Sequence, residues 1–280
     1  MTSSTGTHTA PIMGISRHRL SSDGRGVTTL VGLHGCPLHC HYCLNDKCHE
    51  PAGIRHMMSA QKLYDTVCCD NIYFCATGGG ITFGGGEPAL HSDFIEEFAH
   101  LNKQGWNITL ETSLNVPAHH IAQLLPVVDD YIIDIKSLNP TIYRTYTGVS
   151  IEPLLSNLTH LIEQGKAPHI TVRTPLIPGY NTTQDVEEST EKLRAMGITR
   201  IDNFTYHTHP TQRTKPDGKQ GKSTCNVLKK IRTIIADANH IAYTPTPCTH
   251  SSCTTGNCPM CEQELAWLTN RIATLQNPIL

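Results

Sequence analysis

The sequence lacks long hydrophobic runs, and this absence excludes a class of protein. No stretch of about 18 consecutive apolar residues occurs in the 280 residues, so we expect no transmembrane helix. The first residues, MTSSTGTHTAPIMG, do not place a basic segment before an apolar one, so they do not predict a signal peptide. We therefore expect a cytoplasmic protein with no membrane partner.

Charge is also scarce in this chain. Asp, Glu, Lys and Arg make up 16% of the residues, whereas about a quarter is usual. The formal net charge is −2, which gives no electrostatic reason to expect a nucleic acid as partner. Apolar residues account for 38%, enough for a buried core, and the length allows one large domain or two small ones.

Cysteine, by contrast, is abundant, with twelve residues beside seventeen histidines. In a reducing compartment, clustered cysteines more often bind metal than form disulfides. The first cluster comprises Cys36, Cys40 and Cys43, with Cys48 nearby. The second comprises Cys248, Cys253, Cys258 and Cys261. We expect the other four to be small buried apolar residues; these are Cys68, Cys69, Cys75 and Cys225.

Six β-rich segments alternate with segments of helical periodicity. The predicted strands are Val27–Leu33, Gly80–Phe83, Asn107–Leu110, Tyr131–Ile135, His169–Arg173 and Arg200–Tyr206. The predicted helices are Ser59–Cys68, Asp93–Gln104, Ala118–Leu125, Leu154–Gln164, Asp185–Met196, Ser223–Ala238 and Glu262–Leu275. This alternation predicts an α/β fold with a parallel sheet, although periodicity does not choose between an open sheet and a barrel.

Composition divides the chain into three parts. Residues 1–16 are mostly small and polar at their start, so we expect a frayed N-terminal arm. The alternating segments form a core domain over residues 17–245. The stretch PTPCTHSSCTTGNCPMC has no core periodicity, so residues 246–280 are expected to form a cysteine-rich, metal-binding tail.

The first cysteine cluster lies in the segment GCPLHCHYCLN, which follows the first predicted strand. A [4Fe–4S] cluster needs one ligand per iron, so three thiolates leave one iron open for a substrate. A structural zinc site would instead need a fourth ligand, which Cys48, His39 or His41 could supply. The spacing alone leaves both interpretations open.

The residues around this loop resemble a known family. CPLHCHYC resembles the CxxxCxxC signature of the radical S-adenosylmethionine (SAM) superfamily, with Tyr42 just before the third cysteine. Five further segments resemble, in order, segments of glycyl-radical-enzyme activating enzymes of the pyruvate formate-lyase activase type. These are SDGRGVTTLVGLHGC, ATGGGITFGGGEPAL, IIDIKSLNPTIYRTYTG, VRTPLIPGYN and FTYH. Chance can explain one CxxxCxxC in a cysteine-rich chain, but not five collinear matches.

The resemblance implies a fold, an activity and partners. It implies a partial (β/α)6 TIM-like barrel and an oxidoreductase in which Cys36, Cys40 and Cys43 hold a [4Fe–4S] cluster. That cluster would reductively cleave SAM to a 5′-deoxyadenosyl radical under anaerobic conditions. The implied partners are a glycyl radical enzyme, on which a radical is installed, and a flavodoxin- or ferredoxin-type reductant.

The resemblance also implies which residues surround SAM. They are Tyr42, Gly84, Gly85, Gly86, Glu87, Glu111, Thr112, Asp134, Lys136, Arg173 and His207. Glycine suits the methionine end of SAM, because side chains would keep the backbone away from the ligand. A monovalent cation between Glu111, Asp134 and the SAM carboxylate is implied too, although Glu111 is one methylene longer than the usual aspartate.

Several of these residues have simpler explanations. The glycines can form an ordinary turn between a strand and a helix, and Asp134 can cap a helix. Arg173 can pair with the SAM carboxylate or with Glu87, or form an ordinary interior ion pair. His207 and the nearby His209 can be plain loop residues.

The second cysteine cluster departs from the family pattern. CPMC resembles a zinc knuckle, and four thiolates can equally complete a second [4Fe–4S] cluster. Cys48 could join either cluster, and the tail could also be merely cysteine-rich. This departure leaves two other functions open: a radical SAM enzyme that modifies a peptide or small molecule directly, and a non-catalytic, zinc-stabilised binding protein.

Overall fold

The computed structural model describes residues 8–20, 22–206, 218–248, 258–275 and 278–280. Its strands are β1 (Thr9–Leu20), β2 (Val27–Leu33), β3 (His56–Ser59), β4 (Gly80–Gly85), β5 (Asn107–Thr112), β6 (Asp130–Asp134), β7 (Ile170–Leu176) and β8 (Arg200–Thr205). Its α-helices are α1 (Ala60–Val67), α2 (Asn71–Thr77), α3 (Ser92–Leu101), α4 (Ala118–Leu124), α5 (Pro140–Thr147), α6 (Glu152–Glu163), α7 (Thr183–Ala195), α8 (Gly218–Ala238) and α9 (Pro259–Ala273).

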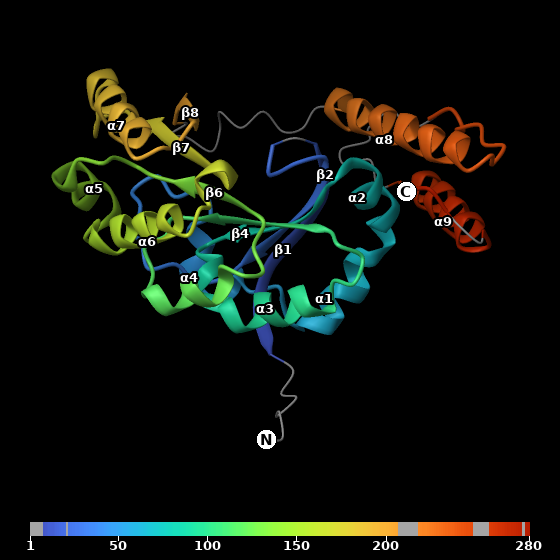
Figure 1. Ribbon diagram of the computed structural model, residues 1–280, viewed down its shortest axis with the longest axis horizontal. Coiled ribbons are helices and arrows are strands. Elements are labelled where there is room, and N and C mark those ends of the chain that lie inside the picture. Colours follow the sequence, from blue (N-terminus) through green and yellow to red (C-terminus); the bar gives the residue numbers. More distant parts are fainter. Residues whose placement is uncertain (1–7, 21, 207–217, 249–257, 276–277) are drawn as a thin grey trace.

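The strands form one curved sheet in the order β3-β1-β2-β4-β5-β6-β7-β8. From β2 to β8 every neighbouring pair is parallel, while β1 runs antiparallel to both β2 and β3. Helices α1, α3 and α4 lie side by side along one face of this sheet (Figure 1). The predicted α/β fold with a mainly parallel sheet is confirmed, and it is consistent with a partial TIM-like barrel.

The six predicted strands correspond to β2 and β4 to β8, but two strands were not predicted. The expected arm over residues 1–16 was wrong from Thr9 onward, because β1 begins there. Ala10 and Ile12 of this strand are fully buried in the main core. Strand β1 also pairs with both β2 and β3, so partners distant in the sequence compensate for its polar composition.

Local signals set several helix ends. Ser59 caps α1, where its hydroxyl accepts a hydrogen bond from the Lys62 amide at 3.2 Å. Helix α7 starts with a capping box, in which Thr182 and Asp185 bond each other's backbone amides. Helix α5, which was not predicted, has Asn139 as its N-cap, followed by Pro140.

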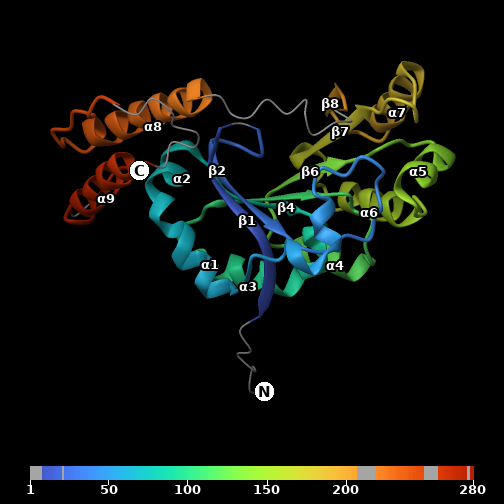
Figure 2. The ribbon, with the colours of Figure 1, turned by 180° about the vertical axis from the view of Figure 1, so that it is seen from behind.

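A second apolar cluster joins β2 and α2 to α8 and α9. Val27, Ile72 and Tyr73 pack with Leu228 of α8 and Leu265 of α9. We call α8 and α9 the C-terminal helical pair; Figure 2 shows it beside α2. Cys225, in the first half of α8, contacts Cys261 in the first turn of α9, and Asn239 bonds Ile279 beyond the ends of both helices, so the two helices run in the same direction.

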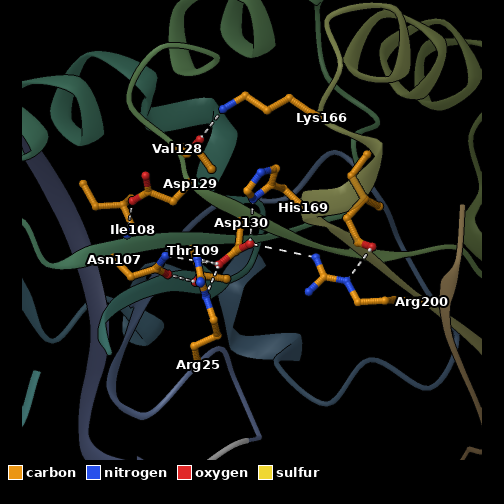
Figure 3. Close-up of polar contacts among 11 residues, drawn as sticks. Arg25, Asn107, Ile108, Thr109, Val128, Asp129, Asp130, Lys166, His169 and Arg200 are labelled. Carbon is orange, nitrogen blue, oxygen red and sulfur yellow. Dashed lines mark hydrogen bonds and ion pairs between the residues drawn. The ribbon is translucent and has the colours of Figure 1, made fainter. Parts of the chain in front are cut away.

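The amino ends of the central strands are held by charged groups (Figure 3). Asp130, at the start of β6, accepts hydrogen bonds from Arg25 Nε at 3.0 Å and from Asn107 Nδ2 at 3.1 Å. His169 and Arg200 also approach its carboxylate. Groups at this end of an α/β barrel serve stability rather than chemistry, which leaves the opposite end for the site.

Among the described residues, no helix is both long and apolar enough to cross a membrane. The predicted division into a core and a tail between residues 245 and 246 stays a prediction. Helix α8 of the predicted core and helix α9 of the predicted tail belong to the same apolar cluster.

Candidate active site

The predicted site residues gather at the carboxyl ends of the parallel strands. Strand β2 leads into the cysteine loop (residues 35–45), and β4 ends in the glycine segment (residues 84–87). Glu111 and Thr112 end β5, Asp134 ends β6, and Arg173 lies beside Asp134 in the register of β7. Parallel α/β folds place their sites at this edge.

The cysteine loop is fastened to the glycine segment by backbone hydrogen bonds. The Gly86 amide donates to the Leu33 carbonyl at 2.8 Å, and the Glu87 amide donates to the Gly35 carbonyl at 2.6 Å. Asn45 Nδ2 closes the far end of the loop by donating to the Gly85 carbonyl at 2.8 Å. These bonds fix the cysteines against the end of β4.

Two other elements hold the middle of the loop. The His39 and His41 amides donate to the Thr147 and Tyr146 carbonyls at the end of α5, at 2.8 and 3.2 Å. Directly after β8, the Tyr206 hydroxyl donates to the Tyr42 carbonyl at 2.8 Å. The loop is therefore attached to both halves of the sheet.

Cys36, Cys40 and Cys43 are half-buried and free. Burial raises the pKa of the Cys40 thiol to about 11 and that of Cys36 further, so binding a metal here must release protons. The donor set fits three of the four irons of a cubane. In the part of the chain that the structure describes, no three His, Cys, Asp or Glu side chains are arranged around a single metal ion.

Cys48 is a neighbour of Cys36 and Cys43. It is buried, and its carbonyl accepts a hydrogen bond from the Gly35 amide at 3.0 Å. Burial, and next the neighbouring Cys43 thiol, raise the pKa of Cys48 to about 11. The other two candidates for a fourth zinc ligand lie differently, since His39 stacks on His49 at 4.6 Å and His41 contacts Tyr180.

Gly85 and Gly86 of the glycine segment have no room for side chains. Gly85 has a φ of 103°, which favours glycine. A Cβ on Gly86 would lie 2.2 Å from the Gly35 carbonyl oxygen. The glycines are therefore required for the close approach of β4 to the cysteine loop.

Glu87 is fully buried, and its carboxylate binds a turn after β5. It accepts hydrogen bonds from the Thr112 hydroxyl at 2.6 Å and from the Ser113 amide at 2.8 Å. Burial raises the pKa of Glu87, although these hydrogen bonds oppose the rise. Glu87 and Thr112, both predicted to bind SAM, thus bind each other and fix the glycine segment to β5.

Glu111 and Arg173 form an ion pair on the concave side of the sheet. Arg173 Nη1 donates to Glu111 Oε1 at 2.7 Å, and Nη2 donates to the Ser22 carbonyl at 2.7 Å. The alternative pairing of Arg173 with Glu87 was wrong, because the Glu87 carboxylate is occupied by the turn after β5. Burial, with repulsion from Asp134, raises the pKa of Glu111 to about 7.

Asp134 and Lys136 form a second pair next to the cysteine loop, with Nζ 3.5 Å from Oδ2. Burial alone would lower the pKa of Lys136, but Asp134 and Cys40 raise it above its ordinary value. Both carboxylates, Glu111 and Asp134, already have cationic partners, so this arrangement does not favour a monovalent cation. We assign no step to one.

Tyr42 belongs to an aromatic group beside the loop. Its ring lies 6.1 Å from that of Tyr146 and 5.7 Å from that of Tyr180. Lys136 Nζ lies 5.6 Å from the centre of the Tyr206 ring. These rings shield one side of the cysteine loop from water.

Some predictions lie elsewhere. His207, His209 and Cys253 are outside the described residues. The expectation that Cys68 and Cys69 are buried was wrong, because both are exposed at the end of α1 and on the short turn that follows it. Cys75 is half-buried, while Cys225 and Cys261 are buried in contact with each other.

Sequence reasoning missed two charged residues of the site, Arg19 and Asp23. Asp23 is buried and binds Arg19, and it contributes to the raised pKa of Glu111. The end of β1 and the loop that follows it therefore bring a third cation and a third carboxylate to the concave side. In the sequence, SDGRG is only part of the family resemblance. No local pattern indicates that Asp23 in this segment is buried.

Comparisons with known proteins agree with this geometry. Residues 30–193 match the family model described as "Radical SAM superfamily". The chain is 27% identical over 241 residues to the pyruvate formate-lyase 2-activating enzyme of Escherichia coli (strain K12), covering 75% of this chain and 82% of that one. It is 30% identical over 207 residues to the pyruvate formate-lyase-activating enzyme of Listeria monocytogenes serovar 1/2a, covering 70% and 82%.

Among solved structures, a domain of a pyruvate-formate lyase-activating enzyme from Bacteroides vulgatus is similar. It shares 26% identity with a TM-score of 0.41, covering 55% of this chain and 94% of that one.

Proposed function

Because the chain belongs to the radical SAM superfamily, we propose that Cys36, Cys40 and Cys43 bind a [4Fe–4S] cluster at which SAM is reductively cleaved. We further propose that the resulting radical installs a glycyl radical on a partner enzyme. The names of the relatives support this second step, since they are activating enzymes of pyruvate formate-lyases.

One observation carries the proposal: the three-cysteine loop is bonded directly to the glycine segment. The bonds from the Gly86 and Glu87 amides bring the three glycines at the end of β4 next to three half-buried thiols. A bound cluster would supply the electron that splits SAM into methionine and a 5′-deoxyadenosyl radical, which takes a hydrogen atom from its substrate.

The residues of this chain bind and orient SAM. Backbone groups of the glycine segment approach the methionine end, where side chains would interfere. The Lys136 ammonium lies beside Cys40 and would offer a positive charge to the carboxylate of bound SAM. Arg173 would offer a second positive charge to the same carboxylate, and it would then release Glu111 to accept from the ammonium group of SAM.

Other groups position these residues and exclude water. Glu87 holds the glycine segment through Thr112 and Ser113. Tyr42, Tyr146, Tyr180 and Tyr206 cover one side of the loop, which protects a reactive radical from solvent.

The proposal includes partners that the sequence resemblance implies. A flavodoxin- or ferredoxin-type protein donates the electron, and the site of action is the cytoplasm, where thiols stay reduced. The resemblance implies that His207, which is outside the described residues, binds the SAM ribose. The tail cysteines, among them Cys248 and Cys258, bind an auxiliary metal.

The test is anaerobic reconstitution with iron and sulfide, followed by reduction and addition of SAM. We expect 5′-deoxyadenosine from the wild type and none from Cys40→Ala, which retains its fold because the sheet core is apolar. An absence of cleavage by the wild type contradicts both enzymatic functions and leaves the non-catalytic binding protein.

A second readout separates the two enzymatic functions. Addition of a glycyl radical enzyme should give the doublet EPR signal of a glycyl radical. Cleavage without that signal, but with a modified peptide or small molecule, would favour direct modification instead.

A further inference from the structure

Two buried thiols from different helices contact each other in the C-terminal helical pair. Cys225 lies in the first half of α8, and Cys261 lies in the first turn of α9. Their Sγ atoms are 3.5 Å apart, and the residues are only 1% and 4% exposed. Among the described residues, no further His, Cys, Asp or Glu side chain completes a metal site around them.

Packing alone does not require cysteine at both positions. Leu228 and Leu265, about one turn further along α8 and α9, belong to the second apolar cluster, so the two thiols lie at one end of an apolar seam. Thiols are weak donors and weak acceptors, so two of them gain little from each other that two apolar side chains would not gain. A reaction between the thiols does require both.

A third cysteine gives solvent access to this pair. Cys258 is the N-cap of α9, three residues before Cys261, and it is half-buried. The residues between them, Pro259 and Met260, are exposed. Side chains at the N-cap and at the third helical position lie together at the first turn of a helix. The Cys258 thiol is therefore a neighbour of the Cys261 thiol, on the side that solvent reaches.

From these contacts we propose that Cys225 and Cys261 form a disulfide by exchange with a low-molecular-weight disulfide, which reacts first with Cys258. The sulfurs of a disulfide are about 2.0 Å apart, so the two Sγ atoms must approach each other by about 1.5 Å from their present 3.5 Å. Rotation about the Cα–Cβ bonds of both residues moves the sulfurs by distances of this order.

The exchange has three steps and needs no other oxidant. The Cys258 thiolate attacks the small disulfide, forms a mixed disulfide and releases one small thiol. Cys261 then attacks the Cys258 sulfur, and the second small thiol leaves. Cys225 finally attacks the Cys261 sulfur, so the Cys225–Cys261 bond forms and Cys258 is a thiol again. The protein loses two electrons and two protons, and the small disulfide gains them.

The product would join two helices that are otherwise held together by noncovalent contacts. Both helices pack, in the second apolar cluster, against Val27 at the start of β2. A cross-link between them restricts the unfolded chain, so the oxidised protein should resist unfolding better than the reduced protein. This inference goes beyond the proposed function and does not rest on the radical chemistry at the cysteine loop.

The test is disulfide mapping of the reconstituted full chain. The protein is incubated anaerobically with glutathione disulfide, and its free thiols are then alkylated under denaturing conditions. Cyanogen bromide cleavage after Met260, followed by trypsin, separates Cys225, Cys258 and Cys261 into three fragments. We expect mass spectrometry to find the Cys225 and Cys261 fragments joined to each other and Cys258 alkylated.

Three variants check the order of the steps. Cys225→Ser should stop one step earlier, with Cys258 joined to Cys261. Cys258→Ser should still join Cys225 to Cys261, but more slowly, because both remaining thiols are buried and exchange depends on access. The matched control is Cys75→Ser, at a half-buried thiol on α2, which should react like the wild type.

Three results would overturn the proposal. They are a wild type in which Cys225 and Cys261 stay alkylated, a wild type in which Cys258 and Cys261 stay joined to each other, and a Cys258→Ser variant that reacts at the wild-type rate. SAM cleavage by the untreated sample reports on the proposed function separately, so either conclusion can fail while the other stands.

Urea unfolding of the wild type keeps the test decisive if Cys225→Ser does not fold. The oxidised wild type is compared with its own reduced form, so no substitution affects the result. Its unfolding midpoint should rise on oxidation, because the cross-link closes the long loop between Cys225 and Cys261. Equal midpoints in the two redox states would contradict a bond between the helices.

Discussion

The side chain of Tyr206 makes two different contacts at the site. Its hydroxyl binds the carbonyl of Tyr42, next to Cys43, while its ring lies under the Lys136 ammonium. The first contact positions the cysteine loop and the second stabilises a charge by a cation–π interaction. The two tasks can be separated by removing the hydroxyl alone.

We therefore predict that Tyr206→Phe loosens the loop without removing the lysine contact. A lost neutral hydrogen bond costs about 1 kcal/mol, equivalent to about five-fold in a rate or an equilibrium. Bleaching of the reconstituted cluster in air should be faster by about that factor. Tyr180→Phe, which keeps its ring contacts with Tyr42 and Tyr146, should bleach at the wild-type rate; equal rates in all three proteins would contradict the prediction.

The Glu111 carboxyl makes stability depend on pH. Its pKa rises from 4.5 to about 7 because burial and Asp134 disfavour the charged form. Between these two pH values the folded protein therefore binds a proton that the unfolded chain has lost. The contribution of Glu111 to the free energy of unfolding is full below about pH 4.5 and is lost as the pH rises through about 7.

The size of this effect is about 2 kcal/mol, since each unit of pKa is worth about 1.4 kcal/mol and partial exposure reduces the total. Urea unfolding of the cluster-free chain at pH 5 and pH 8 should show this loss. Glu111→Gln, which cannot titrate, should lack it. A pH dependence shared by both proteins would assign the effect to another group.

At the scale of elements, the sequence predicted the strands that bury continuous apolar runs. Strand β6 (DYIID) is buried almost throughout and has an apolar centre of Tyr131, Ile132 and Ile133, so its composition reveals it. Strand β1 contains Arg17, His18 and Arg19, and its stability depends on partners that no local pattern identifies. Asn139 and Pro140 did carry a start signal for α5, which was overlooked.

The sequence likewise predicted some residues of the candidate site and not others. Motif residues at strand ends, such as Asp134 and Arg173, meet because parallel strands share one edge. Asp23, Tyr206 and Cys225 could not be predicted, because each reaches its partner through tertiary packing. Their contacts link residues that are far apart in the sequence.

The junction of β4 and the cysteine loop gives a prediction for an element. Gly86→Ala would place a methyl group 2.2 Å from the Gly35 carbonyl oxygen, so the loop must move away. We expect iron incorporation well below the about four atoms of a cubane. Gly14→Ala on β1, where no atom lies within 4 Å of the added carbon, is the control and should reach the wild-type content. Full iron content in Gly86→Ala would contradict the close approach.

At the scale of the whole molecule, a buried ionic network attaches the C-terminal helical pair. The Arg232 guanidinium is fully buried and donates to Glu264 at 2.7 Å, to Tyr243 at 2.8 Å and to Tyr73 of α2. Four segments of the chain therefore meet at one cation.

Removing this cation leaves Glu264 buried without its partner, which typically costs about 3–5 kcal/mol. We predict that Arg232→Met lowers the free energy of unfolding by this amount, whereas Arg194→Met on the exposed end of α7 changes it little. Urea unfolding measures the loss, and hydrogen exchange should place it in α8, α9 and α2. Unchanged protection of these helices would contradict the network's role.

The return of the chain's last helices to Val27, Ile72 and Tyr73 has a consequence for synthesis. At about 5–20 residues per second, the ribosome needs on the order of 10–40 seconds to travel from Tyr73 to Ile272. During that interval the nascent sheet presents an uncovered apolar surface, and chaperones that recognise such surfaces have time to bind it. Synthesis of α8 and α9, rather than completion of the strands, then ends the exposure of this apolar surface.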